Sequence, residues 1–119
     1  MRFVVDSASP QRVVVRLRDG DAEAEVSGWG AAQAAAALVA AIDDARRDGS
    51  GECYWQEPTG QYWWLCRRED RRLEVVVLWS SGAVTGWQHV FRAADEADHV
   101  AANVRDQLAA SGLLPPVSS

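Results

Sequence analysis

Apolar and polar residues alternate along much of the chain, and this period of two predicts antiparallel β-strands. Two stretches instead repeat their apolar residues every three or four positions, which predicts amphipathic helices. The predicted strands cover residues 2–6, 11–18, 21–27, 52–57, 61–68, 72–80 and 84–91, and the predicted helices cover residues 31–47 and 95–110. This order predicts an α+β fold in which the N-terminal strands and a four-strand C-terminal meander form an antiparallel sheet, with both helices packed on one face.

The clearest turn signal in the first half is Asp19-Gly20, which stands between two alternating runs. Asp-Gly in this setting is typical of a two-residue type I′ hairpin turn. Such a turn places Arg16 opposite Glu23. One face of this hairpin is therefore predicted to be a ladder of opposite charges, and the other face is predicted to be apolar.

The two predicted helices have narrow apolar stripes and clear ends. The first is rich in alanine, which gives it a slim face that can lie close to a sheet, and Gly49 is its expected stop. Gly112 ends the second helix in the same way. We expect a single domain over residues 1–114, followed by a disordered tail over residues 115–119.

Two turns define the register of the predicted meander. A two-residue turn at residues 70–71 places Arg67 opposite Glu74, and the opposite charges support this choice. A second two-residue turn at residues 81–82 then places Glu74 beside His89. Both assignments follow from counting residues away from each turn.

This register divides the meander into two faces. Face one is almost purely apolar, so we assign it to the core beneath the helices. Face two mixes large aromatic residues with charged ones, and its predicted members are Trp63, Leu65, Arg67, Glu74, Val76, Leu78, Thr85, Trp87, His89 and Phe91. A sheet face that meets only water should be polar, so face two is either covered by the N-terminal strands or the Trp29 loop, or it binds something.

The row formed by Arg67, Glu74 and His89 is the strongest candidate for catalytic chemistry. In one interpretation Glu74 orients the His89 ring and Arg67 binds an anion nearby, which would make an acid–base site. In the other, the row is a cross-strand salt pair with a neighbouring imidazole. The second interpretation is the more usual one for a sheet.

The two cysteines give only a weak indication of chemistry. A three-residue loop at residues 58–60 would point the Cys53 and Cys66 thiols to opposite faces, and we favour this arrangement because Pro-x-Gly suits it. A two-residue turn at residues 59–60 would make them face each other. We expect reduced, partly buried thiols, no metal and no cofactor, because no metal-ligand spacing, phosphate loop or catalytic serine motif occurs.

Composition narrows the class of protein. Hydrophobic residues make up 48% and charged residues 24%, which is typical of a globular chain. Nucleic acids and anionic lipids bind basic protein surfaces, so the net charge of −5 argues against both as partners. No stretch predicts a membrane helix or a signal peptide, so we expect a cytoplasmic protein. All 12 basic residues are arginine, which we attribute to the codon usage of a GC-rich bacterial genome.

Six tryptophans in 119 residues are too many for one small core. We therefore expect a non-catalytic protein–protein binding domain that docks a partner, or a second copy of itself, through face two. The candidate binding residues are Trp29, Trp63, Arg67, Glu74, Trp87, His89 and Phe91. In size, acidity and α+β pattern the chain is similar, as a class, to bacterial immunity proteins and secretion chaperones. The alternatives are a small-molecule binder or enzyme that uses the His89 row, and a homodimeric structural domain.

Overall fold

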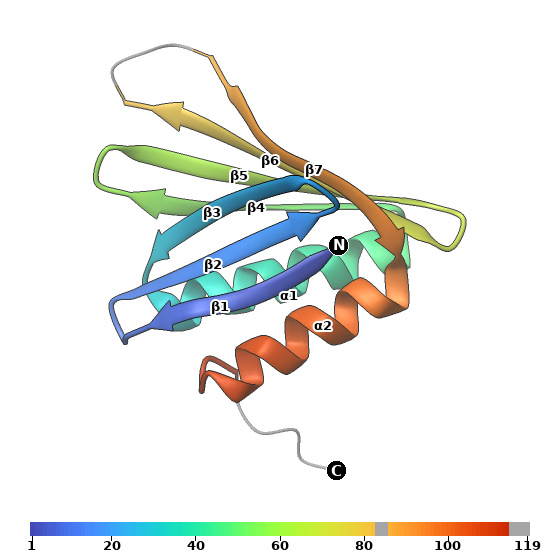
Figure 1. Cartoon of the computed structure of the whole chain (residues 1–119), viewed down its shortest axis with the longest axis horizontal. Helices are drawn as coiled ribbons and strands as arrows, with labels where there is room; N and C mark the ends of the chain where they lie inside the picture. Colours follow the sequence, from blue (N-terminus) through green and yellow to red (C-terminus); the bar gives the residue numbers. More distant parts are fainter. Residues whose placement is uncertain (83–85, 115–119) are drawn as a thin grey trace.

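The computed structural model describes residues 1–82 and 86–114. Its strands are β1 (Arg2–Ala8), β2 (Arg12–Asp19), β3 (Ala22–Trp29), β4 (Ser50–Glu57), β5 (Gly60–Glu69), β6 (Arg72–Ser81) and β7 (Gln88–Glu96), and its helices are α1 (Ala31–Asp48) and α2 (Ala97–Ala110). The predicted α+β class with antiparallel sheet is confirmed (Figure 1).

The strands form two sheets, where the sequence predicted one. Strands β1, β2 and β3 form a three-stranded sheet in that order, and β4 to β7 form a four-stranded meander. Helix α1 packs against β4 and β5, while α2 lies against β1, β7 and α1. The three-stranded sheet and both helices therefore share one side of the meander, and they enclose the core there (Figure 1).

The N-terminal hairpin has the predicted faces with a different register. Asp19 pairs with Ala22, so the turn residues are Gly20 and Asp21, and Arg16 lies opposite Glu25 rather than Glu23. The shift of two residues preserves the faces because side chains alternate with a period of two. The apolar face is buried, and the Arg16 guanidinium still reaches Glu23 diagonally at 3.3 Å.

Helix α1 follows its prediction to within one residue. Its buried stripe includes Leu38 and Ile42, and Gly49 closes it in a left-handed conformation with φ of 99°. The backbone N–H of Gly49 donates to the Ala45 carbonyl at 2.9 Å. The helix then lies so close to β4 that a Cβ placed on Gly51 would collide with the Ala41 carbonyl oxygen.

Helix α2 closes the outer edge of β1. The Asn103 side chain accepts from the Phe3 backbone N–H at 2.9 Å and donates to the Phe3 carbonyl at 3.1 Å. The Gln107 side chain accepts from the Val5 backbone N–H at 3.3 Å. An edge strand whose backbone groups are satisfied in this way does not present a template for another chain.

The meander register is confirmed between β5 and β6 and wrong between β6 and β7. Arg67 pairs with Glu74 as predicted. Strand β7 begins at Gln88 rather than Val84, and the predicted strand residues Val84 and Thr85, the latter a predicted member of face two, lie outside the described residues. The connection is therefore longer than the predicted two-residue turn. A bulge beside Val77 shifts the pairing further, so Glu74 lies opposite Ala94 and not His89.

The turn between β4 and β5 also differs from both predicted forms. Glu57 pairs with Gly60, which leaves Pro58 and Thr59 as the turn. Cys53 lies opposite Trp64 and Cys66 lies opposite Gly51, so both thiols point to face one, and both are buried. The favoured prediction of thiols on opposite faces is therefore wrong.

Candidate functional site

Face two of the meander is open in the described structure. Its members are Ser50, Glu52, Tyr54, Gln56, Gln61, Trp63, Leu65, Arg67, Glu69, Arg72, Glu74, Val76, Leu78, Ser80, Trp87, His89, Arg92, Ala94 and Glu96. None of these side chains is buried, because the helices and the other sheet pack on face one. Of the two alternatives for this face, cover by the N-terminal strands or the Trp29 loop is therefore wrong for the described residues.

Three aromatic side chains form a cluster on face two. Tyr54 and Trp63 are cross-strand partners whose rings stack at 5.7 Å with an interplanar angle of 15°. Trp87 is tilted against both, at 5.1 Å from Trp63 and 6.3 Å from Tyr54. Tyr54 is 44% exposed and Trp87 is 39% exposed. The cluster is thus held by its own contacts while much of its surface faces water.

Glu52 holds the central ring of this cluster. The indole N–H of Trp63 donates to the Glu52 carboxylate at 3.1 Å. Neither Glu52 nor Tyr54 was among the predicted site residues. The missing information was the β4–β5 register, because the Tyr54–Trp63 pair becomes visible only once the turn is placed at Pro58-Thr59.

The other end of face two contains a hollow of about 660 Å³. Leu65 and Val76 are its apolar members on face two, and Glu52, Arg67 and Glu74 are its charged members there. The Glu74 carboxylate accepts two hydrogen bonds from the Arg92 guanidinium, at 2.6 and 2.9 Å. The face therefore changes from aromatic at the Trp63 end to charged at the Arg67 end.

The predicted row of Arg67, Glu74 and His89 is not assembled. Arg67 and Glu74 are cross-strand neighbours, but His89 pairs with Leu78, four residues along β6 from Glu74. Four strand residues span roughly 13 Å, which is far beyond hydrogen-bond reach. The longer β6–β7 connection is the cause, because it moves His89 away from the predicted position.

Two further predicted site residues lie elsewhere. Phe91 pairs with Val77 on face one and is 2% exposed, so it belongs to the core. Trp29 is 48% exposed, but it stands opposite Arg12 in the three-stranded sheet. Of the seven predicted residues, face two therefore retains Trp63, Trp87, Arg67, Glu74 and His89.

The thiols are in poor positions for chemistry. Burial raises the pKa of the Cys66 thiol to about 12. Burial also raises the pKa of Cys53, with smaller contributions from Cys66 and Glu52. The thiolate is the reactive form of cysteine, so these side chains are poor nucleophiles near neutral pH. The described residues contain no group of three His, Cys, Asp or Glu side chains that could hold a metal ion.

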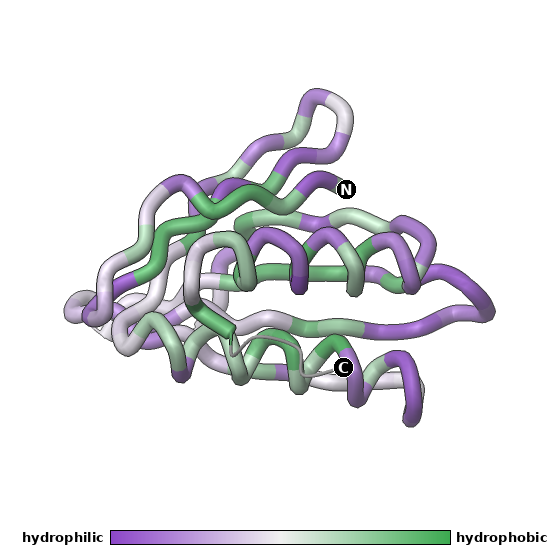
Figure 2. The backbone as a smooth tube through the Cα atoms, turned by 90° about the horizontal axis from the view of Figure 1, so that it is seen from below, coloured by the Kyte–Doolittle hydropathy of each residue, from purple (hydrophilic) through white to green (hydrophobic). Residues whose placement is uncertain are grey.

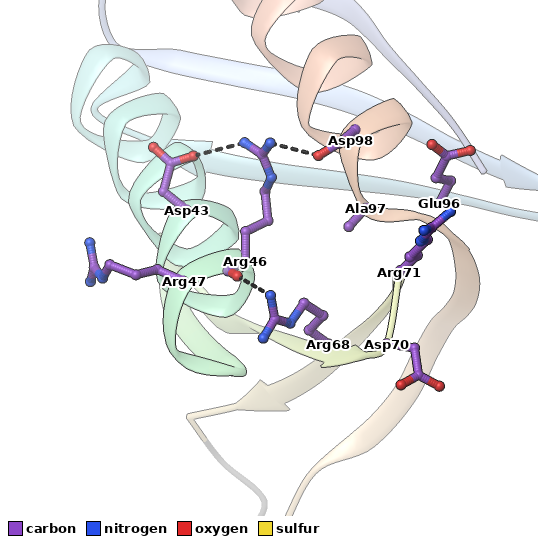
Figure 3. A pocket seen from close by; sticks show the side chains of 9 residues that line it. All are labelled: Asp43, Arg46, Arg47, Arg68, Asp70, Arg71, Glu96, Ala97 and Asp98. Carbon is purple, nitrogen blue, oxygen red and sulfur yellow. Dashed lines mark hydrogen bonds and ion pairs between the residues drawn. The ribbon is translucent and has the colours of Figure 1, made fainter.

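A second, strongly polar hollow of about 650 Å³ lies where α1 ends and α2 begins. Figure 3 shows Arg46 between Asp43 and Asp98, with the Arg46–Asp98 ion pair at 2.7 Å. Arg68 donates to the Arg46 carbonyl at 2.6 Å, and Arg105 pairs with Asp43 from the other helix. The two ion pairs tie α1 to α2 and the Arg68 contact ties β5 to α1, so we interpret this hollow as a structural joint.

No family model, characterised protein or solved structure matches the chain. No described helix has the length and apolar character needed to cross a membrane. The fold and the site together define a small α+β domain with one open, aromatic sheet face, and the function has to be argued from that face.

Proposed function

We propose that the chain is a non-catalytic binding domain that docks another protein through face two. The observation that supports this proposal is the exposed cluster of Tyr54, Trp63 and Trp87 on a sheet face that nothing in the described chain covers. Contiguous exposed aromatic surface on a small domain is typical of an interaction site. Tryptophan, tyrosine and arginine are also the residues that contribute most to binding energy at protein interfaces.

The cluster suits protein recognition because it is already ordered. Ring stacking between Tyr54 and Trp63, and the Trp63–Glu52 hydrogen bond, restrict the side chains before a partner arrives. Less conformational entropy is then lost on binding. A different protein fits better than a second copy, because two chains that each carry a net charge of −5 repel each other.

Site-specific photo-crosslinking in the native host tests the docking surface. A photoreactive phenylalanine analogue replaces Tyr54 in one variant and Trp29 in a matched control, since both side chains are exposed and lie in different sheets. We expect one protein to crosslink to position 54 and not to position 29. Light scattering then distinguishes a foreign partner from a second copy.

Substitution of the cluster is the quantitative test. We expect the double variant Trp63→Ala/Trp87→Ala to weaken binding of the crosslinked protein by about 2 kcal/mol or more, as measured by calorimetry. The same substitutions should leave the far-ultraviolet circular dichroism unchanged, because both side chains lie outside the core. Unchanged affinity in the double variant would exclude face two as the docking surface.

A further inference from the structure

The arginines of the β5–β6 hairpin differ from the others in their partners. Of the eight arginines outside this hairpin, all but Arg2 have a carboxylate oxygen within 4.0 Å. The four in the hairpin, Arg67, Arg68, Arg71 and Arg72, have none among the described residues. Arg68 and Arg72 donate instead to the carbonyls of Arg46 and Ala94. Figure 2 shows this hairpin as a hydrophilic tip at one end of the molecule.

Between the aromatic cluster and the tip of the hairpin, Arg67 is the charged side chain of face two that has no partner in the described chain. The carboxylates nearest to Arg67 are engaged, because Glu52 accepts from Trp63 and Glu74 accepts from Arg92, whereas Glu69 and Glu96 lie at the tip of the hairpin and have no ion pair between described residues. Arg67 is exposed and takes part in no ion pair or side-chain hydrogen bond between described residues. The unpartnered charge that a partner would meet beside the aromatic cluster is therefore positive.

A partner that covers face two removes water from Arg67. A guanidinium that loses its water without gaining an acceptor is strongly unfavourable, whereas a carboxylate can accept two parallel hydrogen bonds from it. The Leu65–Val76 hollow beside Arg67 offers an apolar site next to that carboxylate. A productive partner therefore has to supply an acidic group here, together with apolar surface.

We propose that the partner presents a largely apolar segment with one carboxylate placed against Arg67. This inference rests on the proposed function and names the chemistry of the docking segment. Trp63 and Arg67 lie four residues apart on β5, so the segment places its apolar anchor roughly 13 Å from its carboxylate. The net charge of −5 repels a strongly acidic protein at long range, which favours a single acidic contact over an acidic tract.

The test uses a phage-displayed library of short random peptides and the full chain. Peptides are selected on the wild-type chain and counter-selected on the Trp63→Ala/Trp87→Ala variant, so that only binders of the aromatic cluster remain. Their dissociation constants are then measured for the wild type, for Arg67→Ala, and for Arg18→Ala. Arg18 is a matched control because it is an exposed arginine on the outer face of the other sheet.

We expect the selected peptides to share one Asp or Glu. Arg67→Ala should weaken them about tenfold or more, and Arg18→Ala should leave binding unchanged. Changing the acidic residue of the peptide to its amide should weaken binding to the wild type by a similar factor. The same change should have little effect on binding to Arg67→Ala. That loss of additivity identifies the pair in direct contact.

The outcomes separate this inference from the proposed function. Peptides that require Trp63 and Trp87 but bind Arg67→Ala as tightly as the wild type would overturn the acidic contact and leave the docking surface standing. A library that yields no peptide dependent on Trp63 and Trp87 would overturn both.

Discussion

Trp63 and Trp64 are neighbours in the chain and have opposite environments. Trp64 points to face one, is 1% exposed, and lies 4.9 Å from Trp55 and 6.5 Å from Phe3. Trp63 points to face two, where it packs against the exposed Tyr54 and Trp87 and donates its indole N–H to Glu52. One sheet therefore uses the same residue type to build a core on one side and an open surface on the other.

Comparing the two faces separates the side chains that stabilise the fold from those that contribute little to it. Face one contains buried aliphatic and aromatic side chains, and its one buried side-chain nitrogen without a partner in the described structure is Nε1 of Trp64. Burial of apolar area offsets that missing hydrogen bond. The Tyr54–Trp63–Trp87 cluster stays partly exposed, so it contributes less to folding than the buried tryptophans do.

Replacing Trp64 or Trp63 with alanine should give the largest difference in stability between the two faces. Trp64→Ala should lower the free energy of unfolding by about 3–5 kcal/mol, because it leaves a cavity in the core. Trp63→Ala should lower it by about 1 kcal/mol or less, because its site is open to water. Urea unfolding followed by circular dichroism measures both, and equal losses would contradict the division into a core face and an open face.

Glycine substitution sharpens the same comparison at the backbone. Gly51→Ala should cost about 3 kcal/mol, because its new Cβ would meet the Ala41 carbonyl carbon and oxygen on face one. Gly82→Ala is the control, since a Cβ there has no neighbour within 4 Å. Thermal unfolding of the two variants should differ clearly, and a Gly51→Ala protein as stable as the control would mean that α1 does not lie this close to β4.

The two hairpins of the meander show how much of this arrangement can be predicted from sequence. The β5–β6 register was predictable because one turn puts Glu69 opposite Arg72 and Arg67 opposite Glu74 at the same time. The β6–β7 register was not. Ser81-Gly82 has the composition of a two-residue turn, and no local signal reveals the longer connection or the bulge beside Val77.

The error had a direct effect on the candidate site. The longer connection took His89 away from Glu74, and the bulge beside Val77 turned Phe91 into the core. Trp63 and Trp87 still lie on one face, since the shift before the bulge is an even number of residues and keeps each side chain on its side of the sheet. An aromatic face was thus predictable from alternation, whereas its exposure and the neighbours of each side chain required the structure.

The buried thiols of Cys53 and Cys66 on face one should have a smaller effect on stability, and this effect should depend on pH. Their pKa values are raised in the folded chain above the ordinary value of 9.0, to about 12 for Cys66. As pH rises above 9, the unfolded chain releases protons that the folded chain retains, so stability falls. The slope is about 1.4 kcal/mol per pH unit for each thiol between the two pKa values.

The double variant Cys53→Ala/Cys66→Ala isolates this contribution. Its unfolding free energy should fall less steeply between pH 9 and 10 than that of the wild type, because other titrating groups are common to both chains. Parallel pH dependences would show that the thiols are as accessible as those of the unfolded chain.

The smallest effect on stability is expected from the Glu74–Arg92 ion pair on face two. Glu74 and Arg92 are joined by two short hydrogen bonds, but Arg92 is 66% exposed. Water and salt screen such a pair, so a double-mutant cycle of Glu74→Gln and Arg92→Ala should give a coupling of about 0.2–1 kcal/mol that decreases in high salt. A coupling of several kcal/mol would mean that face two contributes to folding as face one does. A small coupling means that this pair can be rearranged when a partner covers the face, while the Trp64 side keeps the domain folded.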